Sequence, residues 1–69
     1  MNRQPVSSSS VASIGYDPDS QTLEVEFVHG GIYQYFDVPE SEYRQLISAS
    51  SIGTYLAAVI KGTYRVAKL

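Results

Sequence analysis

The sequence contains no cysteine and only one histidine, His29. Without cysteine the chain can form neither a disulfide nor a thiolate metal site, and one histidine cannot supply a polyhistidine site. The 69 residues suffice for one domain, and a chain this short buries only about 60% of its unfolded surface. We therefore expect packing, helix caps or a partner subunit to provide the stability, with no metal or other cofactor required.

Long apolar runs are also absent. No stretch approaches the roughly 20 residues of a membrane span, and no apolar segment follows Arg3 as it would in a signal peptide. The sequence therefore predicts a cytoplasmic protein with no membrane partner.

Acidic residues are absent from the last part of the chain. All seven acids lie between Asp17 and Glu42, and Arg3 is the only base before Glu42. The other four bases all follow it: Arg44, Lys61, Arg65 and Lys68. Such asymmetry is typical of a chain with an anionic partner, or of two charge sets that neutralise each other across the fold.

The residues of a catalytic site are missing as well. The serines cluster in a polar arm and at a helix cap, without a positioned base to activate one of them. Asp17 and Asp19 form a turn without the spacing of a calcium-binding loop, and Gly30–Gly31 lacks the strand–loop–helix context of a phosphate loop. We expect a non-enzymatic protein with no catalytic residue, no metal site and no small-molecule substrate.

The first half of the chain has the alternation of β-strands. Residues 1–10 form a polar arm with four consecutive serines, which we expect to be mobile. Three strands are predicted over residues 11–17, 22–28 and 32–38. The first strand places three side chains on one face: Ala12, Ile14 and Tyr16. The second strand does the same with Leu23, Val25 and Phe27, opposite Glu24 and Glu26, which predicts a sheet with one solvated face.

The turn after the second strand decides which face carries Tyr33 and Tyr35. A three-residue loop, His29–Gly30–Gly31, places both tyrosines on the core face, where they pack. A two-residue Gly30–Gly31 loop places them on the solvated face, where aromatic rings can stack on RNA bases. We favour the three-residue loop.

The second half of the chain has helical periodicity. A first helix is expected from Pro39 to Ala49, and its core stripe comprises Tyr43, Leu46 and Ile47. A second helix follows, capped by Ser50 or Ser51, with a longer stripe: Ile52, Tyr55, Leu56, Val59 and Ile60. The predicted fold is α+β, a three-stranded antiparallel β-meander followed by two α-helices packed on one face.

Four short runs resemble the KTSC domain family. They are Ser13–Asp17, Leu23–Phe27, Gly31–Pro39 and Ser51–Tyr55, and the third contains the Tyr-x-Tyr typical of the family. The resemblance covers about Val6 to Leu69, nearly the whole chain. It implies one KTSC-like domain, which we place at residues 11–69, after the polar arm of residues 1–10. The family takes its name from the C-terminus of some lysyl-tRNA synthetases and also occurs as small bacterial proteins. Its function is not established, and RNA binding has been suggested for it from the synthetase context.

One departure from the family pattern makes a different function plausible. Ala57 replaces an asparagine, so the run after Tyr55 is wholly apolar. We expect this run to form an interaction face for a protein partner or a second copy of the chain. The face comprises Leu56, Ala57, Ala58, Val59 and Ile60. We expect a small binding module that uses this face for protein–protein interaction or self-association.

The alternative is weak RNA binding through the basic C-terminal end. The expected site combines bases with tyrosines that can stack on unpaired bases: Arg44, Lys61, Tyr64, Arg65 and Lys68, with Tyr33 and Tyr35. Three or four phosphate contacts on a single strand imply a log–log salt slope of only about −2 to −3.

Overall fold

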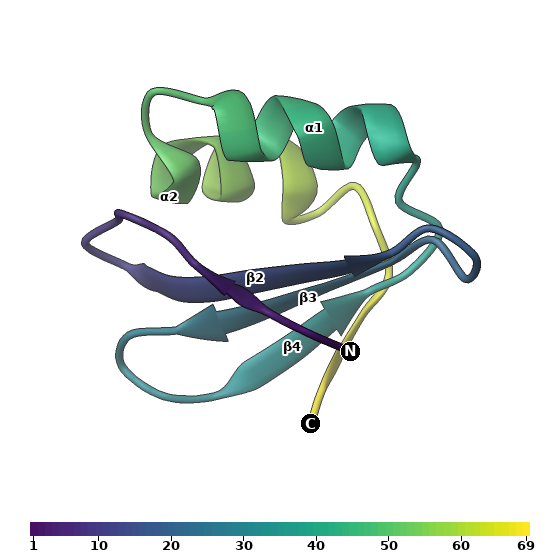
Figure 1. The fold of residues 1–69 in the computed structure, drawn as a ribbon, viewed down its shortest axis with the longest axis horizontal. Coiled ribbons are helices and arrows are strands. Elements are labelled where there is room, and N and C mark those ends of the chain that lie inside the picture. The colour runs from purple at the N-terminus through teal and green to yellow at the C-terminus, as the bar shows by residue number, and fades with distance from the viewer.

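Five antiparallel strands form one sheet, and all the helical segments lie on one of its faces (Figure 1). The computed structural model describes residues 1–69. The strands are neighbours in chain order: β1 (Gln4–Pro5), β2 (Val11–Asp17), β3 (Thr22–Phe27), β4 (Ile32–Tyr35) and β5 (Val66–Lys68). The helical layer comprises α1 (Glu40–Ser48), α2 (Ile52–Tyr55) and the π-helix η1 (Leu56–Ile60). The α+β class is confirmed, and the sheet has two more strands than the sequence predicts.

The hairpin between β3 and β4 determines which face of the sheet carries Tyr33 and Tyr35. Val25 pairs with Tyr33 and Leu23 with Tyr35, and the Phe27 N–H donates to the Gly31 carbonyl at 3.1 Å. The loop therefore has three residues, 28–30, with Gly30 at a φ of 103°, which suits glycine. The preference for an odd loop is confirmed, although β3 ends one residue earlier than expected. Both tyrosines lie on the helix-covered face.

A β-bulge changes which side chains of β2 enter the core. The register of β2 against β3 shifts between Val11, which pairs with Phe27, and Ser13, which pairs with Glu26. The extra residue turns Val11 toward the helices together with Ile14, and both are fully buried. The prediction that Ala12 shares the core face with Ile14 is therefore wrong. A bulge adds one residue and so interrupts the simple alternation of side chains between the two faces.

The edges of the sheet come from segments that the sequence does not mark as strands. In the arm of residues 1–10, Gln4 pairs with Ile14 and Pro5 with Ser13. At the other edge, the C-terminal segment pairs with β4, and Lys68 lies opposite Tyr33. Two or three residues of pairing are too few to show as alternation in a sequence.

Arg3 anchors the arm to the sheet face that the helices leave open. Its guanidinium forms an ion pair with the buried carboxylate of Glu24 and donates through Nε to Ser13 Oγ at 3.0 Å. Gln34 Nε2 also donates to Glu24, at 2.9 Å. The hydrogen bonds from Gln34 and Arg3 and the charge of Arg3 hold the pKa of Glu24 below its ordinary value despite burial. The arm thus packs on the sheet through a network in which these polar groups all have hydrogen-bond partners. The mobility expected for the arm stays a prediction.

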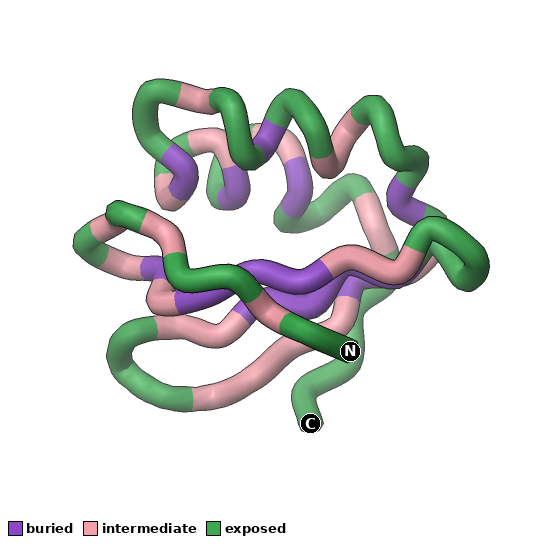
Figure 2. The backbone as a smooth tube through the Cα atoms, in the orientation of Figure 1, coloured by how far each residue is buried: buried purple, intermediate pink, exposed green.

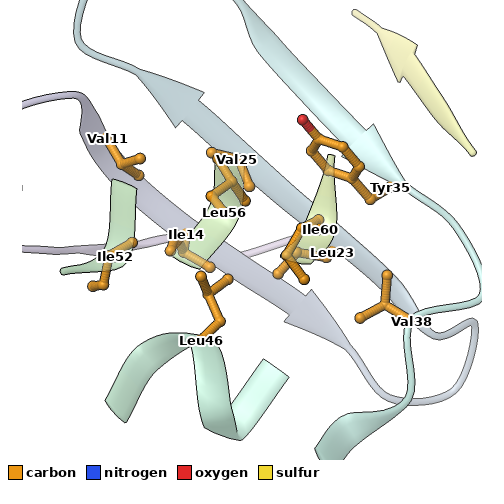
Figure 3. Packing of buried hydrophobic residues seen from close by; sticks show 10 residues of the cluster. All are labelled: Val11, Ile14, Leu23, Val25, Tyr35, Val38, Leu46, Ile52, Leu56 and Ile60. Atoms are coloured by element: carbon orange, nitrogen blue, oxygen red, sulfur yellow. The ribbon is translucent and has the colours of Figure 1, made fainter. Parts of the chain in front are cut away.

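The core lies between the sheet and the facing sides of the helices (Figures 2 and 3). Ten buried side chains form it: Val11, Ile14, Leu23, Val25, Tyr35, Val38, Leu46, Ile52, Leu56 and Ile60. Tyr43 packs at its margin, where its ring stacks on Tyr16 at 4.7 Å between centroids. Ile47, expected in the core, is 44% exposed, so that part of the predicted stripe on α1 is wrong.

The second helix begins as predicted and then widens. Ser51 Oγ accepts a hydrogen bond from the Thr54 N–H, which confirms the expected cap. Beyond Tyr55 the backbone becomes a π-helix, whose closing bond runs from the Lys61 N–H to the Leu56 carbonyl at 2.9 Å. Ile60 is buried as expected, while Val59, also expected in the core, is only half-buried.

Gly53 permits close contact between the helical layer and the serine arm. A Cβ at this position would lie 2.3 Å from Ser10 Oγ. Only glycine fits here without displacing the arm, because every other residue has a Cβ. No helix of the structure is long and apolar enough to cross a membrane.

Candidate functional site

Two lysines are the only lysine or arginine residues without an acidic partner. Arg44 pairs with Glu40 at 2.8 Å, and Arg65 pairs with Asp37 at 3.1 Å. Arg3 pairs with Glu24, as described above. No ion pair involves Lys61 or Lys68, which follow η1 and end β5. Their charge is therefore available to an external anion.

Both lysines lie beside the same pair of aromatic rings. Phe27 and Tyr33 meet edge to face, with 5.4 Å between ring centroids. The Lys61 ammonium lies 5.2 Å from the Phe27 centroid, and the Lys68 ammonium lies 5.9 Å from that of Tyr33. A cation at this distance is attracted by the electron-rich face of a ring, which helps to hold a long lysine side chain in place.

A concave surface of about 350 Å³ opens between the β3–β4 hairpin and the end of η1. Six residues line it, and none is acidic: Phe27, His29, Gly30, Tyr33, Tyr35 and Lys61. Gly31 borders it, because a Cβ there would lie 3.1 Å from the Tyr33 ring and 3.5 Å from Lys68 Cε. We call Phe27, His29, Tyr33, Lys61 and Lys68 the basic–aromatic patch.

The structure brings together only part of the predicted RNA-binding set. Tyr33, Lys61 and Lys68 gather in the patch, whereas Arg44 and Arg65 are held by acids. The remaining two members of the set are tyrosines of the interior and its margin. Tyr35 is 3% exposed, and burial raises the pKa of its hydroxyl. Tyr64 is half-buried and bonded to Glu42, so its ring is not free to stack on a base.

The sequence does not reveal Phe27 and His29 as members of the site. The alternation of β3 places Phe27 with the core residues Leu23 and Val25, and a single histidine is excluded only as a polyhistidine metal site. The signal that could have found them is the three-residue loop, which places Phe27 and Tyr33 on one face and His29 between them at the turn.

Glu42 joins three segments of the helical layer through tyrosine hydroxyls. Tyr64 donates to Glu42 Oε1 at 2.9 Å, and Tyr55 donates to Glu42 Oε2. Burial, the bond to Glu42 and its negative charge raise the pKa of Tyr64 to about 12. The bond to Glu42 likewise raises the pKa of Tyr55. The cluster ties α1 to α2 and to the start of the C-terminal segment.

This cluster predicts a loss of stability at alkaline pH. The folded state holds the Tyr64 proton more tightly than the unfolded chain, whose tyrosines ionise near pH 10. Its contribution is therefore complete below about pH 10 and declines as pH rises toward about 12. Denaturant unfolding across this range should show the decline. In Glu42→Gln we expect lower stability at neutral pH and a smaller alkaline loss. Asp19→Asn removes an acid that raises the pKa of no tyrosine, so it should keep the full loss.

The expected interaction face is divided between the core and the surface. Leu56 and Ile60 are 1% and 0% exposed, so they cannot contact a partner, and that part of the prediction is wrong. Ala57 and Ala58 are exposed, and Val59 is half-buried. The two alanines border a concave surface of about 660 Å³, which also includes Gly53 and the serines of residues 7–10 and 50–51.

The structure contains no group of three or more histidine, cysteine, aspartate or glutamate side chains able to hold a metal ion. No buried side-chain nitrogen or oxygen lacks a hydrogen-bond partner. The interior therefore offers no orphaned polar atom as a starting point for a buried site.

A five-stranded antiparallel sheet with helices on one face, in 69 residues, places the chain among the small α+β domains. The chain belongs to the KTSC domain family, whose model matches residues 7–64. The crystal structure of a KTSC domain protein from Yersinia pestis superposes with a TM-score of 0.96 at 48% identity, over 99% of this chain and 96% of that one.

Two kinds of protein contain a sequence similar to this chain. An uncharacterized protein of Stutzerimonas stutzeri is 44% identical over 61 residues, which are 88% of this chain and 86% of that protein. A lysine–tRNA ligase of a Nostoc species is 43% identical over 54 residues, which are 78% of this chain and 10% of the ligase. The same domain thus occurs nearly alone and as a small part of a larger protein.

Proposed function

We propose that this protein is a non-catalytic module that binds single-stranded RNA through the basic–aromatic patch. The observation that carries the proposal is that the two bases without an acidic partner lie beside the Phe27–Tyr33 ring pair, Lys61 next to Phe27 and Lys68 next to Tyr33. Single-strand binding sites combine cations for the backbone with rings on which bases stack.

The distribution of acids supports the same surface. The net charge of −2 opposes phosphate binding in general. However, Glu24 and Glu26 lie on the opposite face of the sheet from Tyr33, because they alternate with its partner Val25. Arg3 pairs with both of these carboxylates on that face. The patch is therefore the part of the molecule best suited to an anionic strand.

One of the two kinds of relative supports the proposal of RNA binding. The Nostoc relative is named a lysine–tRNA ligase, an enzyme that acts on a transfer RNA. A weak site is useful in such a context, because attachment to a larger RNA-binding protein raises its effective concentration. With two lysines the patch provides fewer phosphate contacts than the sequence alone suggests.

A titration followed by nuclear magnetic resonance tests where RNA binds. On adding a short single-stranded RNA at low salt, we expect the amide signals of Phe27–Tyr33, Lys61 and Lys68 to shift. The signals of Arg44 on α1 and of Ser13 on the outer sheet face serve as internal controls and should stay in place. An unchanged spectrum, or shifts centred on Ser13, would refute the proposal.

A second candidate function is self-association through Ala57 and Ala58. These exposed side chains are small and border the concave surface of about 660 Å³, so a helix of a second copy could approach closely. Sedimentation across a dilution series measures this directly. If the protein self-associates, its mass rises with concentration, whereas the Ala58→Glu variant stays monomeric. An unmodified protein that is monomeric at every concentration would exclude self-association.

A further inference from the structure

We infer that the concave surface of the basic–aromatic patch is a site for one unpaired nucleotide, with its base against the Tyr33 ring and its phosphate on the lysines. The inference rests on the proposed function and deepens it by naming the unit that the surface takes. Its basis is the coincidence of an open hollow, exposed cations and aromatic rings at one end of the sheet.

The size of the hollow favours a single base. A volume of about 350 Å³ is near the lower end of the range for small-molecule sites, roughly 300 to 1,000 Å³. Its walls come from the β3–β4 hairpin on one side and from Lys61, at the end of η1, on the other. A base held in a duplex is stacked and paired on both edges and cannot enter such a hollow. The site therefore requires a base that is already free.

The hollow and its border offer two kinds of contact. The half-buried Tyr33 ring and His29 line the hollow, and every base has a face that can stack on a ring. Lys61 lines the hollow and Lys68 lies beside the Tyr33 ring at its border, and neither has an acidic partner. The edge-to-face contact with Phe27 restricts the orientation of the Tyr33 ring.

The hollow also lacks the groups that would repel a nucleotide. None of its lining residues is acidic, and the hairpin tip at Gly30 leaves open space around it. With ring stacking as the main contact for the base, we expect little preference among the four nucleobases.

The test uses uridine and adenosine monophosphates with ribose 5-phosphate as the control. We expect both nucleotides to bind, to displace single-stranded RNA from the patch and to bind at least tenfold more tightly than ribose 5-phosphate, because stacking adds to phosphate binding. Tyr33→Leu should remove this difference, and Tyr33→Phe should retain it. A spectrum of each variant confirms that it folds. His29→Ala removes the other ring that lines the hollow, at the exposed hairpin tip. This variant should bind both nucleotides less tightly.

The outcomes separate this inference from the proposed function. If RNA binds and depends on the lysines, but nucleotides bind no better than ribose 5-phosphate, the nucleotide site is wrong and the proposed function stands. If Tyr33→Leu leaves the nucleotide affinity unchanged, the inference is equally wrong. If duplex RNA competes as well as single-stranded RNA, the requirement for a free base is refuted. If neither RNA nor nucleotide binds, both proposals fail.

Discussion

Replacing Leu56 by alanine is expected to lower the free energy of unfolding by about 2–5 kcal/mol, a large part of the stability of so small a domain. Leu56 is 1% exposed and packs in the core beside Val25 and Ile14 (Figure 3). Its removal leaves a cavity between the sheet and η1 that neighbouring side chains fill only in part. Denaturant unfolding followed by circular dichroism measures the loss.

Ile47→Ala is the matched control for this change. It also removes side-chain carbons from an apolar residue of a helix, but Ile47 is 44% exposed. We expect it to cost less than about 1 kcal/mol, because little buried surface is lost and alanine favours the helix. Equal losses for the two variants would contradict the assignment of Leu56 to the core and Ile47 to the surface.

This pair of residues shows where helical periodicity works and where it does not. The pattern correctly places Leu46, Ile52 and Leu56 in the core. An α-helix has 3.6 residues per turn, so side chains four apart drift by about 40° at each step. Ile60 is buried as the stripe predicts, but no residue of the run Leu56–Ile60 signals in advance that its backbone forms a π-helix. Ile47 satisfies the spacing of the stripe but lies at its outer edge.

The sheet was predictable where the strands are long and uncertain where they are short. The alternation of β3 and the turn signals define the central meander. The bulge at the start of β2 and the edge strands β1 and β5 depend on contacts between distant segments. Arg3, for example, reaches Glu24 across the sheet, and its position in a polar arm gives no sign of this partner.

The sequence predicts the basic character of the candidate site, but not which residues form it. Charge asymmetry indicates that the last part of the chain is basic, and Lys61 and Lys68 do lie in the patch. The sequence offers Glu40 as a partner for Arg44, four residues away on the predicted helix. It cannot reveal that Arg65 pairs with Asp37, which lies on a distant loop.

Removing the two lysines together is the second change with a large expected effect. In Lys61→Ala/Lys68→Ala we expect the affinity for single-stranded RNA to fall by at least tenfold at low salt. Each lysine–phosphate contact on a single strand contributes about −0.7 to the slope of log affinity against log salt concentration. The proposed site therefore predicts a slope of about −1.4 for the unmodified protein, and the double variant should lose most of it.

Arg44→Ala/Arg65→Ala is the control with the same change in net charge. Acids hold both arginines, so they offer little to a phosphate, and their removal also leaves Glu40 and Asp37 unpaired. We expect this variant to bind somewhat less tightly but to keep the salt slope of the unmodified protein. A general electrostatic attraction without a site would affect the two double variants alike.

The most direct test of the account is therefore the salt dependence of RNA affinity in the three proteins, measured by fluorescence anisotropy between about 50 and 200 mM salt. Binding at Lys61 and Lys68 predicts a slope near −1.4 for the unmodified protein and for Arg44→Ala/Arg65→Ala, and a slope near zero for Lys61→Ala/Lys68→Ala. Equal slopes and affinities in both double variants, or no binding by the unmodified protein at the lowest salt, would contradict it.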